Sequence, residues 1–383
     1  IVEGAALWYV IIAKKYRQVY YFAIADVRAL AVLAVFVVVA AVRQFGIGLD
    51  DFNFELSDSA RHLMYARAVA DHGQLINMYF SSLNSGLIMN MLRGSIGAFS
   101  FYRIFILFET GVLFLNGALF WGLIRRYLQD KVSIIIGVIL TVAYMLGYPW
   151  NSMVFGTAYL STSILCVTMI MFLMDIYLNN EAWSKILTAG LVVVSCYALL
   201  CSYSLFVPPV LGGIILLVLF KYVKEHSIPA KKIYAVGGIL IAVCIVFGII
   251  FLYFWLVKGA LDKKLDALSW WGYIYGTLYA DFLFAIPFCL VWFIKSVKAK
   301  KVNVESIMLF VLLAYTFVLF LGNCCGKISA YYYYKTYYIL WIAVFMVMAR
   351  AIIALRNEKT FMLSYFITWG LVFLVYISSA EKK

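Results

Sequence analysis

Long apolar runs separated by short polar connections recur along the whole chain. Runs of about 20 apolar residues are typical of helices that cross the hydrocarbon core of a bilayer. We predict about twelve spans: 1–13, 27–43, 100–124, 132–149, 156–178, 186–204, 206–220, 232–256, 279–296, 304–322, 334–354 and 360–377. Two of these, 1–13 and 206–220, are short for a full crossing. The pattern indicates an all-α polytopic membrane protein with about 11–13 transmembrane helices in a single domain over residues 1–383.

Basic residues are concentrated in alternate connections, around residues 14–17, 125–131, 185, 221–232, 295–301 and 350–359. Lysine and arginine accumulate in cytoplasmic loops, so these connections are predicted to face the cytoplasm. The opposite connections, 44–99, 150–155, 257–278 and 323–333, are then extracytoplasmic. The alternation persists through all the predicted spans and indicates a multi-pass protein of the plasma membrane.

The composition agrees with a membrane protein: 66% of the residues are hydrophobic and 13% are charged, and the mean hydropathy is +0.97. These values exclude a soluble enzyme, a disordered regulator and a secreted disulfide scaffold. The net charge of +13 comes from 31 Lys and Arg against 18 Asp and Glu. Because the basic residues lie between apolar runs, we interpret them as topology determinants and contacts to anionic membrane lipids, and expect no nucleic-acid partner. The chain begins at Ile1 without Met, so we expect a fragment with truncated ends.

The first extracytoplasmic loop, 44–99, is long and patterned. Ser57 can cap a helix that Gly73 can end. This helix carries two arginines and is expected to lie in the outer membrane interface. Leu56, Ala60, Leu63, Met64 and Val69 form its rough apolar stripe, while Arg61, His62, Tyr65 and Asp71 fall mostly elsewhere. The stretch 87–92 predicts a second interfacial helix.

The loop also carries the pattern Asp58-x-Ala60-Arg61-x-Leu63-x-x-Ala66-Arg67-x-Val69-Ala70-x-x-Gly73. It resembles the first-loop motif of GT-C glycosyltransferases, such as the lipid A aminoarabinose transferases and protein O-mannosyltransferases. The resemblance implies an integral membrane enzyme that uses a polyprenyl-phosphate-linked sugar, inverts the sugar linkage and uses Asp58 as its catalytic base. Ser59 stands where the family often has Glu, so no role of that Glu is carried over. Monosaccharide-transferring relatives usually need no divalent cation, and we expect no cofactor or resident metal.

An extracytoplasmic transfer of this kind needs a carboxylate base, cations for the leaving phosphate and an apolar groove for the prenyl chain. Asp50 and Asp51 remain alternatives to Asp58 as the base, and Glu55 is a further carboxylate beside them. The other candidate substrate-binding residues are basic or aromatic and are predicted near the outer face: Arg61, His62, Arg93, Arg103, Lys327, Lys335, Tyr334, Trp270 and Trp271.

Each of these candidates also has an ordinary structural interpretation. Lys335 can bind phosphate beneath aromatic residues, or it can be a snorkelling lysine within an interfacial aromatic belt. Arg61 is as well placed to pair with Asp58 as to bind phosphate. His62 is interpreted first as a solvated histidine, and the two tryptophans of loop 257–278 as interface anchors. Glu109, within span 100–124, is an intramembrane charge and therefore a functional candidate with no identified partner.

The leading hypothesis is a glycosyltransferase with an extracytoplasmic active site, a polyprenyl-phosphate sugar as donor and a glycan, lipid or protein as acceptor. A transporter or flippase for a lipid-linked or sugar substrate is the main alternative. A glycan polymerase or ligase of the O-antigen type is less consistent, because its large loop normally comes late and is rich in Arg and His. A noncatalytic subunit of a larger membrane assembly is the fourth possibility.

Overall fold

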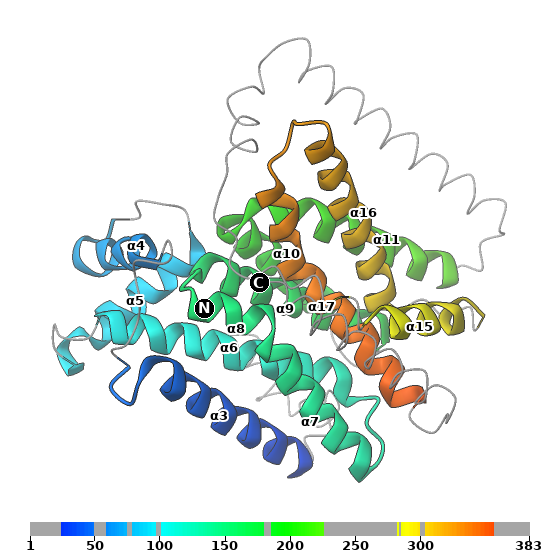
Figure 1. Ribbon diagram of the computed structural model, residues 1–383, viewed down its shortest axis with the longest axis horizontal. Coiled ribbons are helices and arrows are strands. Elements are labelled where there is room, and N and C mark those ends of the chain that lie inside the picture. Colours follow the sequence, from blue (N-terminus) through cyan, green and yellow to red (C-terminus); the bar gives the residue numbers. More distant parts are fainter. Residues whose placement is uncertain are drawn as a thin grey trace, which may run out of the picture.

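A computed structural model describes residues 24–49, 59–74, 79–96, 101–179, 185–225, 282, 285–298 and 303–355. These residues form helices and connections without a strand (Figure 1). The helices are α3 (Ile24–Phe45), α4 (Ser59–His72), α5 (Phe80–Ile96), α6 (Phe101–Arg125), α7 (Lys131–Leu146), α8 (Tyr148–Val154), α9 (Ala158–Asn179), α10 (Lys185–Ser202), the 3-10 helix η3 (Ser204–Phe206), α11 (Val207–Glu225), α15 (Ile286–Lys298), α16 (Val304–Cys324) and α17 (Ala330–Leu355). The prediction of an all-α protein is confirmed for this part of the chain.

Six helical segments within the described ranges are long and apolar enough to cross a membrane: Phe101–Arg125, Ala158–Asn179, Lys185–Ser202, Ser204–Val223, Val304–Cys324 and Ala330–Leu355. The bent pair of α7 and α8 is a seventh if it is counted as one span. The chain is therefore a multi-pass membrane protein. The segment predicted at 206–220 is longer than expected, because α11 continues to Glu225. The predicted spans 1–13, 232–256 and 360–377 lie outside the described residues.

The core of the bundle is formed by α9 and α17, which contact each other and are buried along most of their length. Helices α6, α10 and α16 surround them (Figure 1). Helix α9 has little amphipathic character, as expected for a helix that is apolar on all sides and enclosed by others. Its buried hydroxyls donate to backbone carbonyls one turn earlier, as Thr162 does to Ala158 O and Thr168 to Ile164 O. These bonds satisfy polar groups that would otherwise be costly inside the bundle.

Helices α7 and α8 meet at a bend of 42° at Gly147. Pro149 cannot donate a backbone hydrogen bond, so the α7 ladder cannot continue unchanged through this point. The carbonyl of Tyr144 at the end of α7 accepts two hydrogen bonds, from the backbone N–H of Gly147 at 3.3 Å and from the indole N–H of Trp341 on α17 at 3.0 Å. At the other end of α7, Asp130 and Ser133 form a capping box. The break is thus compensated by a side chain of the central helix.

Substitution of Gly147 by alanine is expected to destabilise the protein by about 1–3 kcal/mol, because it overpacks the core. A Cβ at this position would lie 2.3 Å from Cζ2 of the buried Trp341. Gly190 on α10 is the matched control, since a Cβ there meets nothing within 4 Å. Unfolding in mixed micelles, followed by circular dichroism, measures both variants. Equal stability of Gly147→Ala and Gly190→Ala would contradict the close packing of the bend.

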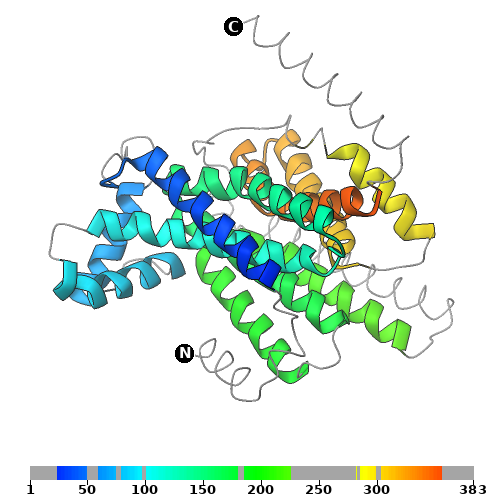
Figure 2. The same cartoon turned by 90° about the horizontal axis from the view of Figure 1, so that it is seen from below.

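Helices α4 and α5 pack against each other and lie together at one end of the molecule (Figures 1 and 2). Helix α5 contacts α6, α9 and α10, at the end of the bundle that the sequence predicts to be extracytoplasmic. As predicted, α4 ends at Gly73, whose φ of 65° lies in the left-handed region. The stretch predicted at 87–92 is part of the longer helix α5.

The predicted apolar stripe of α4 is wrong in detail. Val69 is buried as predicted, but Met64 is 54% exposed and Ala60 is also exposed, while His62 and Ala66, outside the predicted stripe, are buried. The buried face is set by close packing on α5. A Cβ added to Gly86 of α5 would lie 2.6 Å from the carbonyl oxygen of Ala66. Small residues therefore face α5, and the larger Met64 points away from this contact.

Candidate functional site

Several residues predicted for the active site lie outside the described residues: Asp50, Asp51, Glu55, Asp58, Trp270 and Trp271. Arg93 lies on α5, where the structure describes the backbone but not this side chain. The site is therefore built from the remaining candidates, of which His62 and Lys335 are buried.

His62 of α4 is only 3% exposed and lies within a group of aromatic rings. Its ring centroid is 4.9 Å from that of Tyr159, at the start of α9, and 5.4 Å from that of Tyr79, just before α5. Tyr79 and Tyr159 stack on each other at 5.5 Å. The interpretation of His62 as a solvated histidine is wrong, because α4 buries this face against the bundle. His62 instead fixes α4 to the first turn of the central helix α9.

Lys335 of α17 also contacts Tyr159. Its side chain is buried, with 6% exposed, and its ammonium group donates a hydrogen bond to the hydroxyl of Tyr159. The ammonium nitrogen lies 4.5 Å from the ring centroids of both Tyr159 and Tyr331, and 5.4 Å from that of Tyr203. These are favourable cation–π distances. The interpretation of Lys335 as a snorkelling lysine is wrong, because aromatic rings enclose its charged end.

We call this group the Tyr159 cluster; its members are His62, Tyr79, Tyr159, Tyr203, Tyr331 and Lys335. It joins the first loop, the start of α9, the connection after α10 and the start of α17. Burial raises the pKa of Tyr203 well above its ordinary value. Its hydroxyl therefore keeps its proton at neutral pH.

The remaining candidates lie around this end of the bundle in different environments. Arg61 is exposed on the first turn of α4, and Lys327 is exposed in the connection between α16 and α17. Arg103 is half-buried at the start of α6, and its Nε donates to the hydroxyl of Tyr102 at 3.0 Å. Tyr334 packs on Tyr333, with ring centroids 4.2 Å apart. The exposed cations are accessible to a charged headgroup, whereas Lys335 is enclosed.

Glu109 lies further along α6 and is only 2% exposed. Both carboxylate oxygens lack a hydrogen-bond partner within the described part of the chain. The hydroxyl of Ser161 on α9 is close to the carboxylate, yet the two do not meet the geometric requirements of a hydrogen bond. An uncompensated charge in such a place costs several kcal/mol, on the order of a lost buried ion pair. Within the part of the chain that the structure describes, Ser161 is the polar side chain placed beside this buried carboxyl group.

A network of charges missed by the sequence analysis lies at the opposite end of the bundle. Arg350 of α17 is 1% exposed and forms an ion pair with Glu305 of α16, which is fully buried. Its Nη2 also lies 3.5 Å from Asp175 of α9, which forms a second ion pair with Arg126 after α6. The guanidinium of Arg350 covers the ring of Tyr127 at 4.1 Å, and burial raises the pKa of that tyrosine to about 12. We call these residues the Arg350 network; it ties together the ends of four helices.

The sequence does contain a signal for the Arg350 network, namely charged residues within apolar spans. Asp175, Glu305 and Arg350 each fall in an apolar span, near the end predicted to be cytoplasmic. Charges of opposite sign at the same depth in neighbouring helices are expected to pair. A second such pair, Asp26 with Arg125, joins α3 to α6 at the same end, and Trp121 donates to Asp26 at 3.3 Å.

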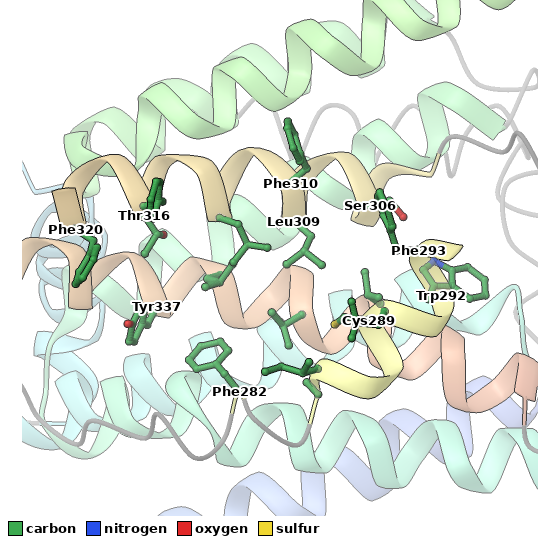
Figure 3. A pocket seen from close by; sticks show the side chains of 18 of the residues that line it. Phe282, Cys289, Trp292, Phe293, Ser306, Leu309, Phe310, Thr316, Phe320 and Tyr337 are labelled. Atoms are coloured by element: carbon green, nitrogen blue, oxygen red, sulfur yellow. The ribbon is translucent and has the colours of Figure 1, made fainter. Parts of the chain in front are cut away.

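An apolar groove of about 600 Å³ lies between α15, α16 and α17 (Figure 3). Phe320 and Tyr337 are at one end of the groove, near the start of α17, and Ser306 and Trp292 are at the other. Tyr333 and Tyr337 line the groove. Lys335, which lies between them in the sequence, belongs instead to the Tyr159 cluster. The groove and the enclosed ammonium group are therefore on different faces of α17.

The described residues contain no group of three or more His, Cys, Asp or Glu side chains that could hold a metal ion. Comparison with protein-family models, with curated proteins and with solved structures finds no match to this chain. The candidate site is thus defined by geometry: a patterned first-loop helix anchored to a buried, lysine-containing aromatic cluster at one end of a transmembrane bundle.

Proposed function

We propose that the chain is an integral membrane glycosyltransferase of the GT-C type. It would move one sugar from a polyprenyl-phosphate donor to a glycan, lipid or protein acceptor at the extracytoplasmic face of the plasma membrane. Asp58 is the proposed base, and no metal is required. The motif that includes Asp58 supports this proposal, as does the packing of the helix that immediately follows it.

The observation that carries the proposal is the contact of α4 with the Tyr159 cluster. Asp58 directly precedes Ser59, the first residue of α4, and Ser59 is buried. His62, less than one turn into the helix, packs on Tyr159, which also accepts a hydrogen bond from Lys335. A catalytic base has to be held within hydrogen-bond reach of the proton that it removes. Anchoring the first turn of α4 on the bundle meets the requirement for a rigid support.

The proposed reaction is a single displacement. The base takes the proton of an acceptor hydroxyl, whose oxygen forms a bond to the anomeric carbon of the sugar. The bond from that carbon to the phosphate oxygen breaks, and the electron pair leaves with the polyprenyl phosphate. Positive charge near the phosphate stabilises this leaving group. The described cations at this end of the bundle include Arg61 and Arg67 on α4, Arg103 at the start of α6 and Lys335 on α17.

Incubation of the reconstituted protein with radiolabelled polyprenyl-phosphate sugar tests the proposal, with an envelope glycan or lipid fraction as acceptor. We expect transfer from the lipid-linked donor and none from the corresponding nucleotide sugar. Lys335→Met is expected to lower kcat/KM by about 10- to 100-fold, because it removes the ammonium group that holds Tyr159 and, through His62, the helix that follows the base. Lys131→Met is the matched control, since Lys131 is exposed at the opposite end of the bundle. Absence of transfer by the wild-type protein from any lipid-linked sugar would overturn the proposal.

A transporter or flippase remains the second candidate, and Glu109 favours it. Buried carboxylates inside membrane bundles commonly mark ion or substrate pathways. This function predicts counterflow of a sugar or lipid in proteoliposomes without a covalent product, and loss of counterflow in Glu109→Gln. A covalent product with unchanged activity in Glu109→Gln would favour the transferase.

A further inference from the structure

The connection between α16 and α17 carries two adjacent cysteines, Cys324 and Cys325. It lies at the tip of the pair formed by these two helices (Figure 1). Both cysteine side chains are exposed, whereas the other described cysteines lie within helices and are buried or partly buried. Among the cysteines that the structure describes, these two are therefore the most accessible, and the chain presents them side by side.

The turn that holds these two thiols is closed by hydrogen bonds. The backbone N–H of Cys325 donates to the carbonyl of Leu321 at 3.0 Å, and that of Gly326 donates to the carbonyl of Asn323 at 2.8 Å. The side chain of Asn323 donates to the carbonyl of Ile328 at 2.7 Å. Gly326 has a φ of 69°, in the left-handed region that ends many helices. The backbone of the two cysteines is thus fixed, while their exposed side chains can still choose among rotamers.

An internal disulfide between these two neighbours is unfavourable. The Cα atoms of adjacent residues are about 3.8 Å apart across a trans peptide bond, whereas a disulfide usually joins Cα atoms about 4.4–6.8 Å apart. In the reduced protein, both sulfurs are therefore available to one shared ligand. Two linked ligand groups bind an ion more tightly than separate ones, because the second bond forms within the same molecule. The pair is suited to chelate a single thiophilic ion.

The number of ligands selects the kind of ion. A structural zinc site uses four ligands in a tetrahedron, and the described residues contain no group of three or more His, Cys, Asp or Glu side chains that could supply them. Thiolates select soft ions such as Cu(I). Two thiolates in a linear arrangement are sufficient for this univalent ion. The complex then has one negative charge, and Lys327, exposed in the same connection, supplies a positive charge two residues after Cys325.

We propose that Cys324 and Cys325 together bind one Cu(I) ion. Each thiol releases its proton to solvent and forms a copper–sulfur bond, and the oxidation state of the metal does not change. Because protons are released, binding is expected to weaken as the pH falls. The site belongs to the connection that leads into α17. It takes no part in the proposed glycosyl transfer, which requires no metal.

Titration of the purified protein with Cu(I), kept reduced by ascorbate and buffered by a coloured Cu(I) chelator, tests this site. We expect the wild-type protein to bind one more ion per chain than Cys324→Ser combined with Cys325→Ser. Each single variant is expected to bind that ion about 100-fold more weakly or worse, because it loses the second linked ligand. Cys196→Ser combined with Cys201→Ser is the matched control, since it removes two partly buried thiols of α10. This control is expected to bind the ion as the wild-type protein does.

Three results would overturn the proposal. The first is equal binding of Cu(I) by the variant that lacks Cys324 and Cys325 and by the α10 control. The second is wild-type affinity in both single variants, since one thiol is then enough. The third is binding of Zn(II) by the wild-type protein in preference to Cu(I). Circular dichroism of each variant without metal separates a lost ion site from a damaged fold, and serine at these exposed positions is expected to leave the helical signal unchanged.

Discussion

Replacement of Arg350 by methionine is expected to lower the free energy of unfolding by about 3–5 kcal/mol. Methionine keeps much of the side-chain volume but removes the guanidinium. Glu305, which is fully buried, then keeps its carboxylate without the cation that compensates it, and Asp175 loses one of its two cations. Breaking one side of a buried ion pair is costly because the remaining charge is stranded away from water. Unfolding in mixed micelles, followed by circular dichroism, measures the loss.

The stranded charge can be removed as a control. Glu305→Gln added to Arg350→Met is expected to recover part of the lost stability, because the double variant contains no unpaired carboxylate at that position. Asp71→Asn provides a second comparison: its partner Arg67 lies 3.7 Å away but is 56% exposed. An exposed pair contributes only about 0–1 kcal/mol. If Arg350→Met costs no more than Asp71→Asn, the Arg350 network does not stabilise the bundle as described.

Asp58→Asn is expected to reduce sugar transfer by a factor of about 10²–10⁴, the usual contribution of a positioned general base. Asparagine keeps the shape of the side chain but cannot accept the proton of the acceptor hydroxyl. The assay is the transfer of label from polyprenyl-phosphate sugar by the reconstituted variant, compared with the wild-type rate. Binding of the donor is expected to change much less than turnover, since the base acts on the acceptor.

Asp50→Asn and Asp51→Asn are the matched controls, because both carboxylates belong to the same loop and were the alternative bases. Each is expected to retain transfer within about threefold of the wild-type rate, as for a residue without a role in proton transfer. Full turnover by Asp58→Asn together with a large loss in one of these two variants would move the base to that residue. Full turnover by all three variants would show that none of these three carboxylates is the catalytic base.

The fold was largely predictable from hydrophobic periodicity, with specific exceptions. The spans at 100–124, 156–178, 304–322 and 334–354 correspond closely to α6, α9, α16 and α17. The break within 132–149 was not predicted, because the apolar pattern continues through Gly147 and Tyr148. The break lies at Gly147 and Pro149, and it packs on Trp341, which is distant in the sequence. Local pattern identifies a span, whereas its bends depend on tertiary partners.

The candidate site was predictable only in part. His62 and Lys335 were both identified as candidates, but nothing in the sequence indicated that they share Tyr159. Both side chains are polar, and both are buried by aromatic rings, which belong to Tyr79, Tyr159, Tyr203 and Tyr331. The face that α4 buries was also set by its neighbour, since Gly86 of α5 packs closely against Ala66 and Val69 and Met64 is left exposed. Composition indicates a polar loop helix, but only packing decides which of its polar residues are enclosed.

The hydrogen bond between Trp341 and Tyr144 has a consequence for biosynthesis. Its donor is 197 residues further along the chain than its acceptor. The carbonyl also has a local donor, the backbone N–H of Gly147, so the end of α7 does not need the indole in order to form. Domains and helices that emerge early usually assemble first during synthesis. The bond from Trp341 then attaches α17 to a bend that is already present, so the formation of α7 and its final packing are separated in time.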